Sequence, residues 1–469
     1  MSGVGSGGGY KDFVNRPLVA CVLALVVTSG RAHAAGFGLF EQSGRGLGSA
    51  FAGEVAEAVD ASTIQYNPAG LGWIEGTQFV SSGFAVLPVA HFENDGSTLN
   101  PALGGGRLSG GNGSDAGSLG LFPVLFLAHE LGDGFHVGLG VTVPFGLETR
   151  YDHFWVGRYH AINSKLETTN VNPTIAWRPT DWFAIGFGAD IEYAKARLTN
   201  AIDLGGVCEI FGAQAGLPPG ACTALGFAPQ STDATVKISG DDWGAGWNMG
   251  LMFQPWTTTR IGLSFRSDIE HNLTGRATFF LPKRAVPLRK ISGALFDTDG
   301  SAAVDLPERA TIGVYHEITP TVAVLADVTW TRWSRFDELV FKFANPKQPT
   351  IVQPEGWQDT YRYALGMRWR PTPTVETRFG FAWDESTIPD ETLRTPRIPD
   401  SERFWLSAGL GWQPFERLRV DVGYAHIFSP DVNIRNADPV TGHILHGSYS
   451  VEANIVGVQM TYNVGWPPL

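Results

Sequence analysis

The chain has 469 residues, of which 58 are glycine and 43% are hydrophobic, and its formal net charge is −12 with an isoelectric point near 5.4. No block of Lys or Arg is present, so the basic surface expected of a nucleic-acid-binding protein is missing and nucleic acid is not an expected partner. Mean hydropathy is −0.03, and no apolar run reaches the roughly 20 residues that a membrane-spanning helix needs.

The N-terminal segment has the layout of a secretory signal peptide. Two basic residues precede an apolar run from Pro17 to Val27, and Ala32-His33-Ala34 precedes Ala35. This order predicts that residues 1–34 are a signal peptide and that the mature chain starts at Ala35. A signal anchor that stays attached is the alternative, but the apolar run is short for a spanning helix.

The next segment, residues 35–75, is rich in Gly and Ala and lacks the alternation of a strand. Small residues that form short helices and tight turns, placed before a barrel wide enough to leak, suit a plug folded into the lumen. We therefore expect an N-terminal plug or hatch over residues 35–75, followed by a barrel over residues 76–469.

Segments that alternate large apolar with small or polar residues recur along the rest of the chain. Ile185, Phe187 and Ile191, for example, share one face, and Asp190 and Glu192 share the other, because successive strand side chains point to opposite sides. A soluble sandwich would bury the apolar face, whereas a membrane barrel exposes it to lipid, and the many repeats favour the barrel. The expected strands lie near 76–90, 118–131, 134–147, 161–178, 182–198, 235–254, 258–274, 305–318, 321–334, 357–370, 374–386, 402–413, 416–428 and 449–464.

The expected fold is therefore an all-β, transmembrane antiparallel barrel of about 14 strands, an even number that allows closure. Connections alternate between short turns, such as 179–181 and 371–373, and long loops, as outer-membrane barrels have at their periplasmic and extracellular ends. The expected long loops are 91–117, 199–234, 275–304 and 429–448. Tryptophans near the strand ends form an expected interfacial girdle: Trp177, Trp182, Trp256, Trp330, Trp369 and Trp412.

Two cysteines remain once the signal peptide is removed. Cys208 and Cys222 lie in a Gly/Pro-rich segment, and export makes a disulfide between them the favoured interpretation. A metal site is the alternative, but two thiols without nearby His ligands form a poor one.

Several motifs occur in order along the chain, and with them the sequence resembles the FadL-type (OmpP1/FadL/TodX) family of outer-membrane transporters for long-chain fatty acids and other hydrophobic compounds. The motifs are Ala35-Gly36-Phe37, Asn67-Pro68-Ala69, Val143-Pro144-Phe145-Gly146-Leu147, Gly240-Asp241-Asp242, Phe265-Arg266-Ser267 and Ile398-Pro399-Asp400-Ser401-Glu402-Arg403. The resemblance covers essentially the whole mature chain.

The resemblance implies a 14-stranded barrel with an N-terminal hatch, an apolar groove among the outer loops and a tighter pocket below it. It also implies that ligand shifts the hatch and leaves sideways through a gap beside a kinked strand. The implied hatch and gating residues are Ala35, Gly36, Phe37, Asn67, Pro68 and Ala69. The implied kink lies at Pro144, Phe145 and Gly146, where proline cannot donate to the ladder; a simple strand end is the alternative.

Ligand-binding candidates come from the residues near these motifs. Leu147, Phe154, Trp155, Val156 and Phe211 are candidates for the apolar lining, with ordinary loop packing as the alternative. Arg150, Arg158 and Arg266 are candidates for binding a carboxylate head group, because Arg offers paired donors. Ion pairs to neighbours such as Asp152 or Asp268 are the alternative, and if all three arginines are paired, a neutral hydrocarbon becomes the better substrate.

The expected function is passive outer-membrane transport of long-chain fatty acids in a Gram-negative bacterium, with uptake of aromatic or alkane hydrocarbons as the alternative. A general porin would lack the plug, and an adhesin or receptor role leaves no signal in the sequence. An enzyme is not expected, because the sequence has no G-x-S-x-G elbow beside the histidines considered as a catalytic base: His129, His136, His153, His160 and His271. We expect no cofactor or metal, contact with outer-membrane lipid, and a monomer.

Overall fold

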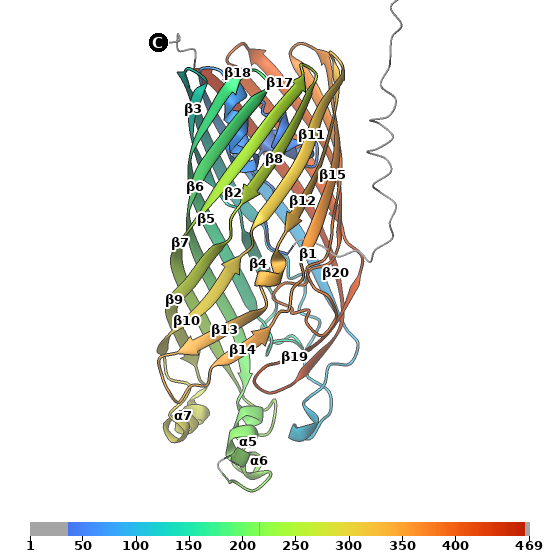
Figure 1. The fold of residues 1–469 in the computed structure, drawn as a ribbon. Coiled ribbons are helices and arrows are strands. Elements are labelled where there is room, and N and C mark those ends of the chain that lie inside the picture. The colour runs from blue at the N-terminus through green and yellow to red at the C-terminus, as the bar shows by residue number, and fades with distance from the viewer. Residues whose placement is uncertain (1–35, 215, 465–469) are drawn as a thin grey trace, which may run out of the picture. The chain divides into compact units, whose positions relative to one another are not determined.

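The protein folds as a closed barrel of antiparallel strands (Figure 1). The computed structural model describes residues 36–214 and 216–464, so the expected signal peptide and Ala35 lie outside the described residues. Within them, 20 strand segments form one sheet, and the sheet closes because β1 pairs with both β2 and β20. The segments are β1 (Thr77–Asn94), β2 (Gly120–Gly132), β3 (Phe135–Thr142), β4 (Gly146–Arg150), β5 (Asn163–Thr180), β6 (Phe183–Asp203), β7 (Asp233–Trp256), β8 (Thr259–Arg266), β9 (Ile269–Phe280), β10 (Thr298–Leu306), β11 (Arg309–Thr319), β12 (Val322–Thr331), β13 (Glu338–Phe343), β14 (Ile351–Pro354), β15 (Thr360–Thr372), β16 (Val375–Asp384), β17 (Arg403–Phe415), β18 (Leu418–Phe428), β19 (Val432–Ala437) and β20 (Ile444–Val464).

The 20 segments make 14 staves, where a stave is one crossing of the wall. Six staves consist of two segments each: β3/β4, β8/β9, β10/β11, β12/β13, β14/β15 and β18/β19. The two segments of such a stave follow one another along the wall, and each pairs with at least one of the same two neighbouring staves. This confirms the predicted barrel of about 14 strands. Several strands run farther than predicted into segments expected to be loops, among them 199–203, 275–280, 298–304 and 432–437.

Four neighbouring staves are interrupted at one level of the wall. Arg266, the last residue of β8, pairs with Arg309, the first of β11, and Arg309 pairs with Thr331, where β12 ends. Thr331 pairs in turn with Thr360, the first residue of β15. Beyond this level the four staves resume only after a gap, at 267–268, 307–308, 332–337 and 355–359.

The outward face of the wall is apolar, as contact with lipid requires. Along β15, Leu365 and Trp369 are 57% and 46% exposed, whereas Arg362 and Arg368, which point inward, are buried. Of the tryptophans predicted to form a girdle, five lie at the end with the short turns, and Trp330 lies toward the other end of its stave. The alternation of exposed apolar and buried polar side chains along the strands is the pattern that the sequence predicted.

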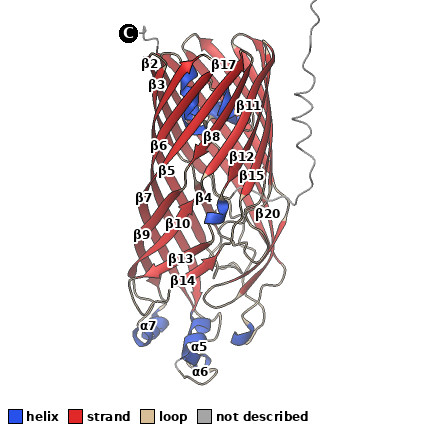
Figure 2. Cartoon of the chain, in the orientation of Figure 1, coloured by secondary structure: helices blue, strands red, loops and turns tan. Residues whose placement is uncertain are grey.

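Short helices precede the first strand and fill one end of the lumen (Figure 2). They are α2 (Gly44–Leu47), α3 (Glu54–Glu57), α4 (Thr63–Tyr66) and η2 (Pro68–Trp73). Their apolar side chains join inward-facing wall residues in one buried cluster that includes Leu47, Ile64 and Leu325. The wall can lie this close because it carries glycine there: a Cβ on Gly380 would sit 2.0 Å from the carbonyl carbon of Ser49.

The charged side chains between these helices and the wall are paired. Arg45 of α2 contacts Glu57 at 2.5 Å and Glu376 of the wall at 3.2 Å, and Arg368 of the wall contacts Glu57 at 2.8 Å. Arg378 likewise pairs with Asp421. A buried charge is costly unless it is paired, so this network ties the plugging helices to the strands in one arrangement.

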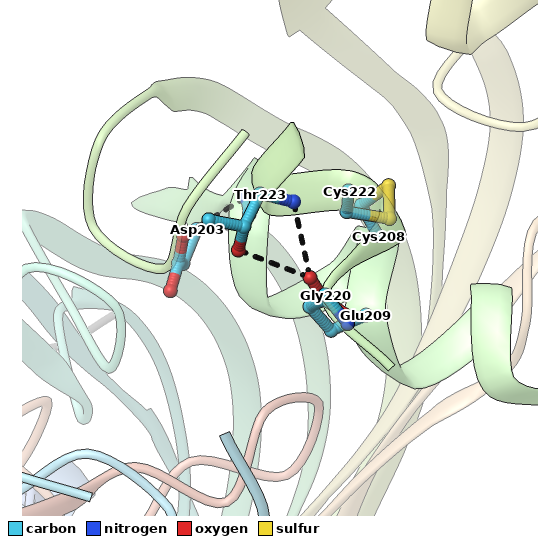
Figure 3. Close-up of a disulfide and its surroundings, with 7 residues drawn as sticks. Asp203, Cys208, Glu209, Gly220, Cys222 and Thr223 are labelled. Atoms are coloured by element: carbon cyan, nitrogen blue, oxygen red, sulfur yellow. Dashed lines mark hydrogen bonds between the residues drawn. A yellow bond between two sulfur atoms is a disulfide. The ribbon is translucent and has the colours of Figure 1, made fainter. Parts of the chain in front are cut away.

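The other end of the barrel carries the long loops and the remaining helices. These are η3 (Pro101–Leu103), α5 (Leu204–Gln214), α6 (Ala221–Ala224), η4 (Lys283–Ala285) and α7 (Val286–Ser292), whereas η5 (Trp333–Arg335) lies in the gap between β12 and β13. A disulfide joins Cys208 of α5 to Cys222 of α6, and the Glu209 carboxylate accepts hydrogen bonds from the backbone of Gly220 and Thr223 (Figure 3). No helix among the described residues is long and apolar enough to cross a membrane.

Candidate ligand-binding site

An apolar pocket lies inside the barrel, beyond the plugging helices, where the space not filled by protein atoms amounts to about 890 Å³ with open solvent included. At this level the inward positions of the strands change character: β6 presents Asp190 and Glu192 deeper in the lumen but Ala196 and Leu198 here. The neighbouring strands do the same, and they supply most of the lining: Leu166, Ile238, Leu273, Ala277, Val304, Leu339, Phe341 and Phe343. Side chains still alternate between the inward and outward faces at this level. The pocket is apolar because the residues at the inward positions are apolar.

Phe37 forms the floor of this inner pocket. Its ring contacts four aromatic rings, with centroid distances of 4.9 Å to Trp333, 5.6 Å to Phe336, 5.6 Å to Trp357 and 5.9 Å to Phe145. Such edge-to-face contacts hold the ring in one place, so Phe37 closes the pocket on the side of the plug.

The chain around Phe37, residues 36–42, is called the arm here. At its start the Gly36 amide donates to the Asp400 carboxylate at 3.1 Å, and Arg403 donates to the Gly36 carbonyl at 2.7 Å. Gly36 has a positive φ of 57°, and a Cβ there would lie 2.6 Å from the Trp357 ring. Only glycine fits this position well, which explains why a glycine precedes the aromatic floor residue.

The arm also pairs with an interruption of the wall. β3 ends at Thr142 and β4 begins at Gly146, and Pro144 lies in the gap. The amide of Leu39 donates to the Pro144 carbonyl at 2.8 Å, and the amide of Gly146 donates to the Phe37 carbonyl at 3.1 Å. The arm therefore takes the place of a strand partner at Pro144, Phe145 and Gly146, and this stave continues beyond the proline instead of ending there.

Gln42 completes the cover of that interruption. Its side-chain amide donates to the Val143 carbonyl at 2.7 Å and its side-chain oxygen accepts from the Val143 amide at 3.1 Å. Backbone groups in a buried wall need such partners. Displacement of the arm would leave backbone groups of Val143, Pro144 and Gly146 without them, whereas Phe145 keeps its hydrogen bonds to Thr168.

Asn67, Pro68 and Ala69 lie deeper, where the plugging helices meet the wall. The Asn67 side chain donates to the carbonyls of Val55 at 2.7 Å and Leu251 at 3.1 Å, and accepts from the Ala69 amide at 3.0 Å. Gly250 of the wall makes room for it, because a Cβ on Gly250 would be 1.8 Å from the Asn67 oxygen. These residues are distant in sequence from the arm and anchor the helices to β7.

A second, larger hollow of about 1950 Å³ opens among the outer loops. Its walls come from the disulfide-bonded segment, including Leu204, Phe211 and Leu225, and from the α7 segment, including Leu288. Five residues line both this outer groove and the inner pocket: Leu198, Ile238, Phe341, Phe343 and Arg397. The two hollows therefore adjoin each other along shared side chains.

The residues that the sequence predicted to form the apolar lining lie in three places: the inner pocket, the outer groove and a separate loop. Leu147 lines the inner pocket and Phe211 lines the outer groove. Phe154 is 82% exposed at the surface of its loop, and Trp155 and Val156 are buried in a separate loop core with Tyr151. The three adjacent residues therefore line neither hollow, because their loop folds into a core of its own.

None of the three arginines predicted to bind a head group lines the inner pocket or the outer groove. Arg158 is buried and contacts Asp233 at 2.7 Å, and Arg266 pairs with Asp190. Arg150 is exposed, and no carboxylate of the described residues lies within 4.0 Å of it. Arg158 and Arg266 therefore form ion pairs, as the alternative interpretation had it, but with Asp233 of β7 and Asp190 of β6 in place of Asp152 and Asp268.

The cation at the boundary of the two hollows is Arg397, which the sequence did not single out. It lies in the loop after β16, and its guanidinium donates to Ser164 at 3.1 Å and to Asn200 at 3.3 Å. Burial lowers the pKa of Arg397 to about 10, so it is still charged at neutral pH. Among the described residues, no carboxylate oxygen lies within 4.0 Å of it.

Glu355 lines the inner pocket together with Arg397. It lies in the gap between β14 and β15, where burial raises its pKa to about 8 against the opposing effect of Arg397. At pH 7 most of this carboxyl group is therefore protonated, and the charge of Arg397 is left for another anion. The signal that could have pointed to Arg397 is its place directly before the motif at 398–403.

Known outer-membrane proteins resemble this chain in sequence and in fold. The sequence matches the model for outer membrane protein transport proteins, described as OMPP1/FadL/TodX, over residues 25–464. It is 29% identical over 434 residues to a long-chain fatty acid transport protein of Escherichia coli, with 91% of this chain and 94% of that protein covered. The fold is similar to that of a Pseudomonas aeruginosa FadL homologue, with a TM-score of 0.83, 22% identity and 92% and 100% of the two chains covered. It is also similar to that of the Pseudomonas putida toluene transporter TodX, with a TM-score of 0.62, 17% identity and 87% and 95% covered.

Proposed function

The chain belongs to the OMPP1/FadL/TodX family of outer membrane transport proteins, and on that premise we propose that it carries long-chain fatty acids across the outer membrane by passive diffusion. Its relatives are outer-membrane proteins of Gram-negative bacteria, so the predicted location is confirmed. The protein is an outer-membrane transporter of hydrophobic compounds, and its family consists of transporters and channels. We propose that it has no enzymatic activity, uses no cofactor and works as a monomer.

The position of Arg397 favours a carboxylic acid over a neutral hydrocarbon as the transported ligand. It is a charged guanidinium at the boundary of two apolar hollows, held by neutral partners, with no carboxylate oxygen of the described residues within 4.0 Å. A carboxylate that accepts its paired N–H donors forms a strong charge-assisted contact in a site of low water content. A toluene-like ligand would leave this charge without an anion.

The apolar lining supplies the rest of the affinity. Each methylene group moved from water to an apolar surface contributes about 0.8 kcal/mol, so a chain of 16 or 18 carbons gains more than a short one. The outer groove is wide and borders solvent, while the inner pocket is smaller and floored by Phe37. This supports capture in the groove followed by transfer to the pocket past the shared side chains.

Release requires a change in shape, because Phe37 and the arm close the inner pocket. The arm covers the wall interruption at Pro144 with its own hydrogen bonds. Ligand that displaces Phe37 would also draw the arm from the interruption, which would open a sideways path toward lipid. This coupling of one segment to both pocket and wall supports hatch movement with lateral release.

Uptake of neutral hydrocarbons is the second candidate function. The inner pocket is lined mostly by apolar side chains, and the similar fold of a toluene transporter shows that this architecture accommodates such a protein. The two functions differ in their dependence on charge. Only the acid should respond to the removal of Arg397.

The test is uptake of labelled oleate by cells that lack their own long-chain fatty acid transporter, with toluene uptake measured beside it. Wild-type protein should take up oleate, and Arg397→Gln should lower both oleate binding by the purified protein and uptake about tenfold or more. Arg435→Gln, at an exposed position of β19, controls for loss of a positive charge. Oleate uptake equal to the empty-vector level by correctly assembled wild type would refute the fatty-acid assignment.

A further inference from the structure

A third and much smaller hollow, with room for about one water molecule, lies in the lumen against the wall interruption, and its lining includes Pro144, Phe145 and Arg309. Arg309 is the first residue of β11 and pairs across the strands with Arg266, so both guanidinium groups face this cavity. Two like charges side by side are unfavourable unless anions balance them.

The other charged groups that line this cavity have partners. Arg266 pairs with Asp190, and Glu192 contacts His271 at 3.3 Å. Among the described residues, none accepts a hydrogen bond from the Arg309 side chain and no carboxylate lies within 4.0 Å of it. Its guanidinium instead lies 4.6 Å from the centroid of the Phe40 ring.

The arm lies between Arg309 and the inner pocket. A Cβ placed on Gly38 would lie 3.7 Å from a guanidinium nitrogen of Arg309, 3.5 Å from Trp333 and 3.8 Å from Phe145. Gly38 directly follows Phe37, the floor residue. Movement of the arm would therefore remove the segment that lies directly between Phe37 and the Arg309 guanidinium.

We propose that Arg309 is a second carboxylate-binding position, which receives the head group of the acid after it leaves Arg397 and holds it beside the interruption at Pro144. The inference rests on the proposed transport of fatty acids. An anion that left Arg397 for a lumen without a free cation would lose its partner in a water-poor space. Arg309 supplies a cation at the point where the wall is interrupted, and a neutral ligand has no need of it.

The test separates binding from passage. Arg309→Gln should leave equilibrium binding of oleate to the purified protein within about twofold of wild type, because Arg397 still holds the head group, and should lower the oleate uptake rate about tenfold. Uptake of oleyl alcohol, which has the same chain and no charge, should stay unchanged. Arg309→Lys should retain more of the oleate uptake than Arg309→Gln because it keeps the charge without the paired donors.

The outcomes are distinct from those of the Arg397 test. Oleate uptake by Arg309→Gln at the wild-type rate would overturn this inference and leave the proposed function intact, and so would an equal loss of oleate and oleyl alcohol uptake. Absence of oleate binding by the wild type would overturn both. If Arg309→Gln does not assemble, the ratio of oleate to oleyl alcohol uptake in Arg309→Lys replaces it, and a ratio equal to wild type counts against the inference.

Discussion

The lumen on the two sides of the arm is built on the same strands but contains opposite chemistry. On the side of the short turns, inward-facing Arg368 and Glu376 engage the plugging helices through buried ion pairs, and Arg378 donates a hydrogen bond to the Arg45 carbonyl. On the side of the long loops, inward-facing Leu198, Ile238 and Phe341 surround empty space. A strand can thus seal the membrane at one end and hold an apolar ligand at the other by changing only its inward residues.

The plugging helices and their ion pairs with the wall should be the part of the protein most sensitive to substitution. Arg45→Met removes a buried cation that Glu57 and Glu376 share and leaves Arg368 as the cation that contacts both, and breaking a buried pair costs about 3–5 kcal/mol. We expect detachment of the plugging helices, measured as uptake of antibiotics too large for the intact outer membrane. Arg435→Met is the control, and unchanged permeability of an assembled Arg45→Met protein would contradict a structural role for the network.

Asn67→Ala tests the attachment of the same helices at a single point. It removes two hydrogen bonds to buried carbonyls of Val55 and Leu251, each of which costs about 1–3 kcal/mol when left unsatisfied. We expect lower resistance to urea and a fall in oleate uptake at matched protein levels. Uptake and urea resistance equal to wild type would show that the helices hold their position without this side chain.

The stability of the protein and ligand binding in the apolar inner pocket should both depend on pH. The pKa of Glu355 is about 8 in the folded protein and about 4.3 in an unfolded chain, so between these values the folded state keeps a proton that the unfolded state has lost. Stability should therefore fall as pH rises through this range. Above pH 8 the ionised carboxyl competes with ligand for Arg397, so oleate should bind more weakly at pH 9 than at pH 7.

Glu355→Gln is the matching variant, because it keeps the shape and cannot ionise. Its oleate affinity should be the same at pH 7 and pH 9, as measured by titration of the purified protein. A decline equal to that of wild type would assign the pH dependence to another group.

The smallest effect is expected at the rim of the outer groove. Replacing both Cys208 and Cys222 by Ser removes the constraint on the α5–α6 segment, which is worth about 2–4 kcal/mol to that segment by the entropic account. We expect faster protease cleavage within residues 204–230 and a fall in oleate uptake of about twofold at low ligand concentration, with barrel stability unchanged. Cleavage at the wild-type rate would mean that the Glu209 contacts alone hold the segment.

The strands could be predicted from the sequence because lipid on one side and a filled lumen on the other impose a strict alternation, as at Ile185, Phe187 and Asp190. The interruptions after Arg266 and Thr331 could not: the alternation continues past Thr331, and after Arg266 it shifts by one residue, so that Ile269 and His271 point inward, a shift that the predicted single strand over 258–274 did not contain. Arg397 was missed for a related reason. Its partners Ser164 and Asn200 lie 233 and 197 residues away, so its role follows from tertiary packing and not from a local pattern.

The four adjacent interruptions affect how distortion spreads through the wall. A hydrogen-bonded ladder transmits strain along its strands, and here the ladder stops at Arg266, Arg309, Thr331 and Thr360. The neighbouring strands β6, β7, β1 and β20 run unbroken past this level, so the wall is continuous on one side of the barrel and interrupted on the other. We therefore expect the interrupted side to deform more readily than the continuous side when ligand enters or leaves the groove.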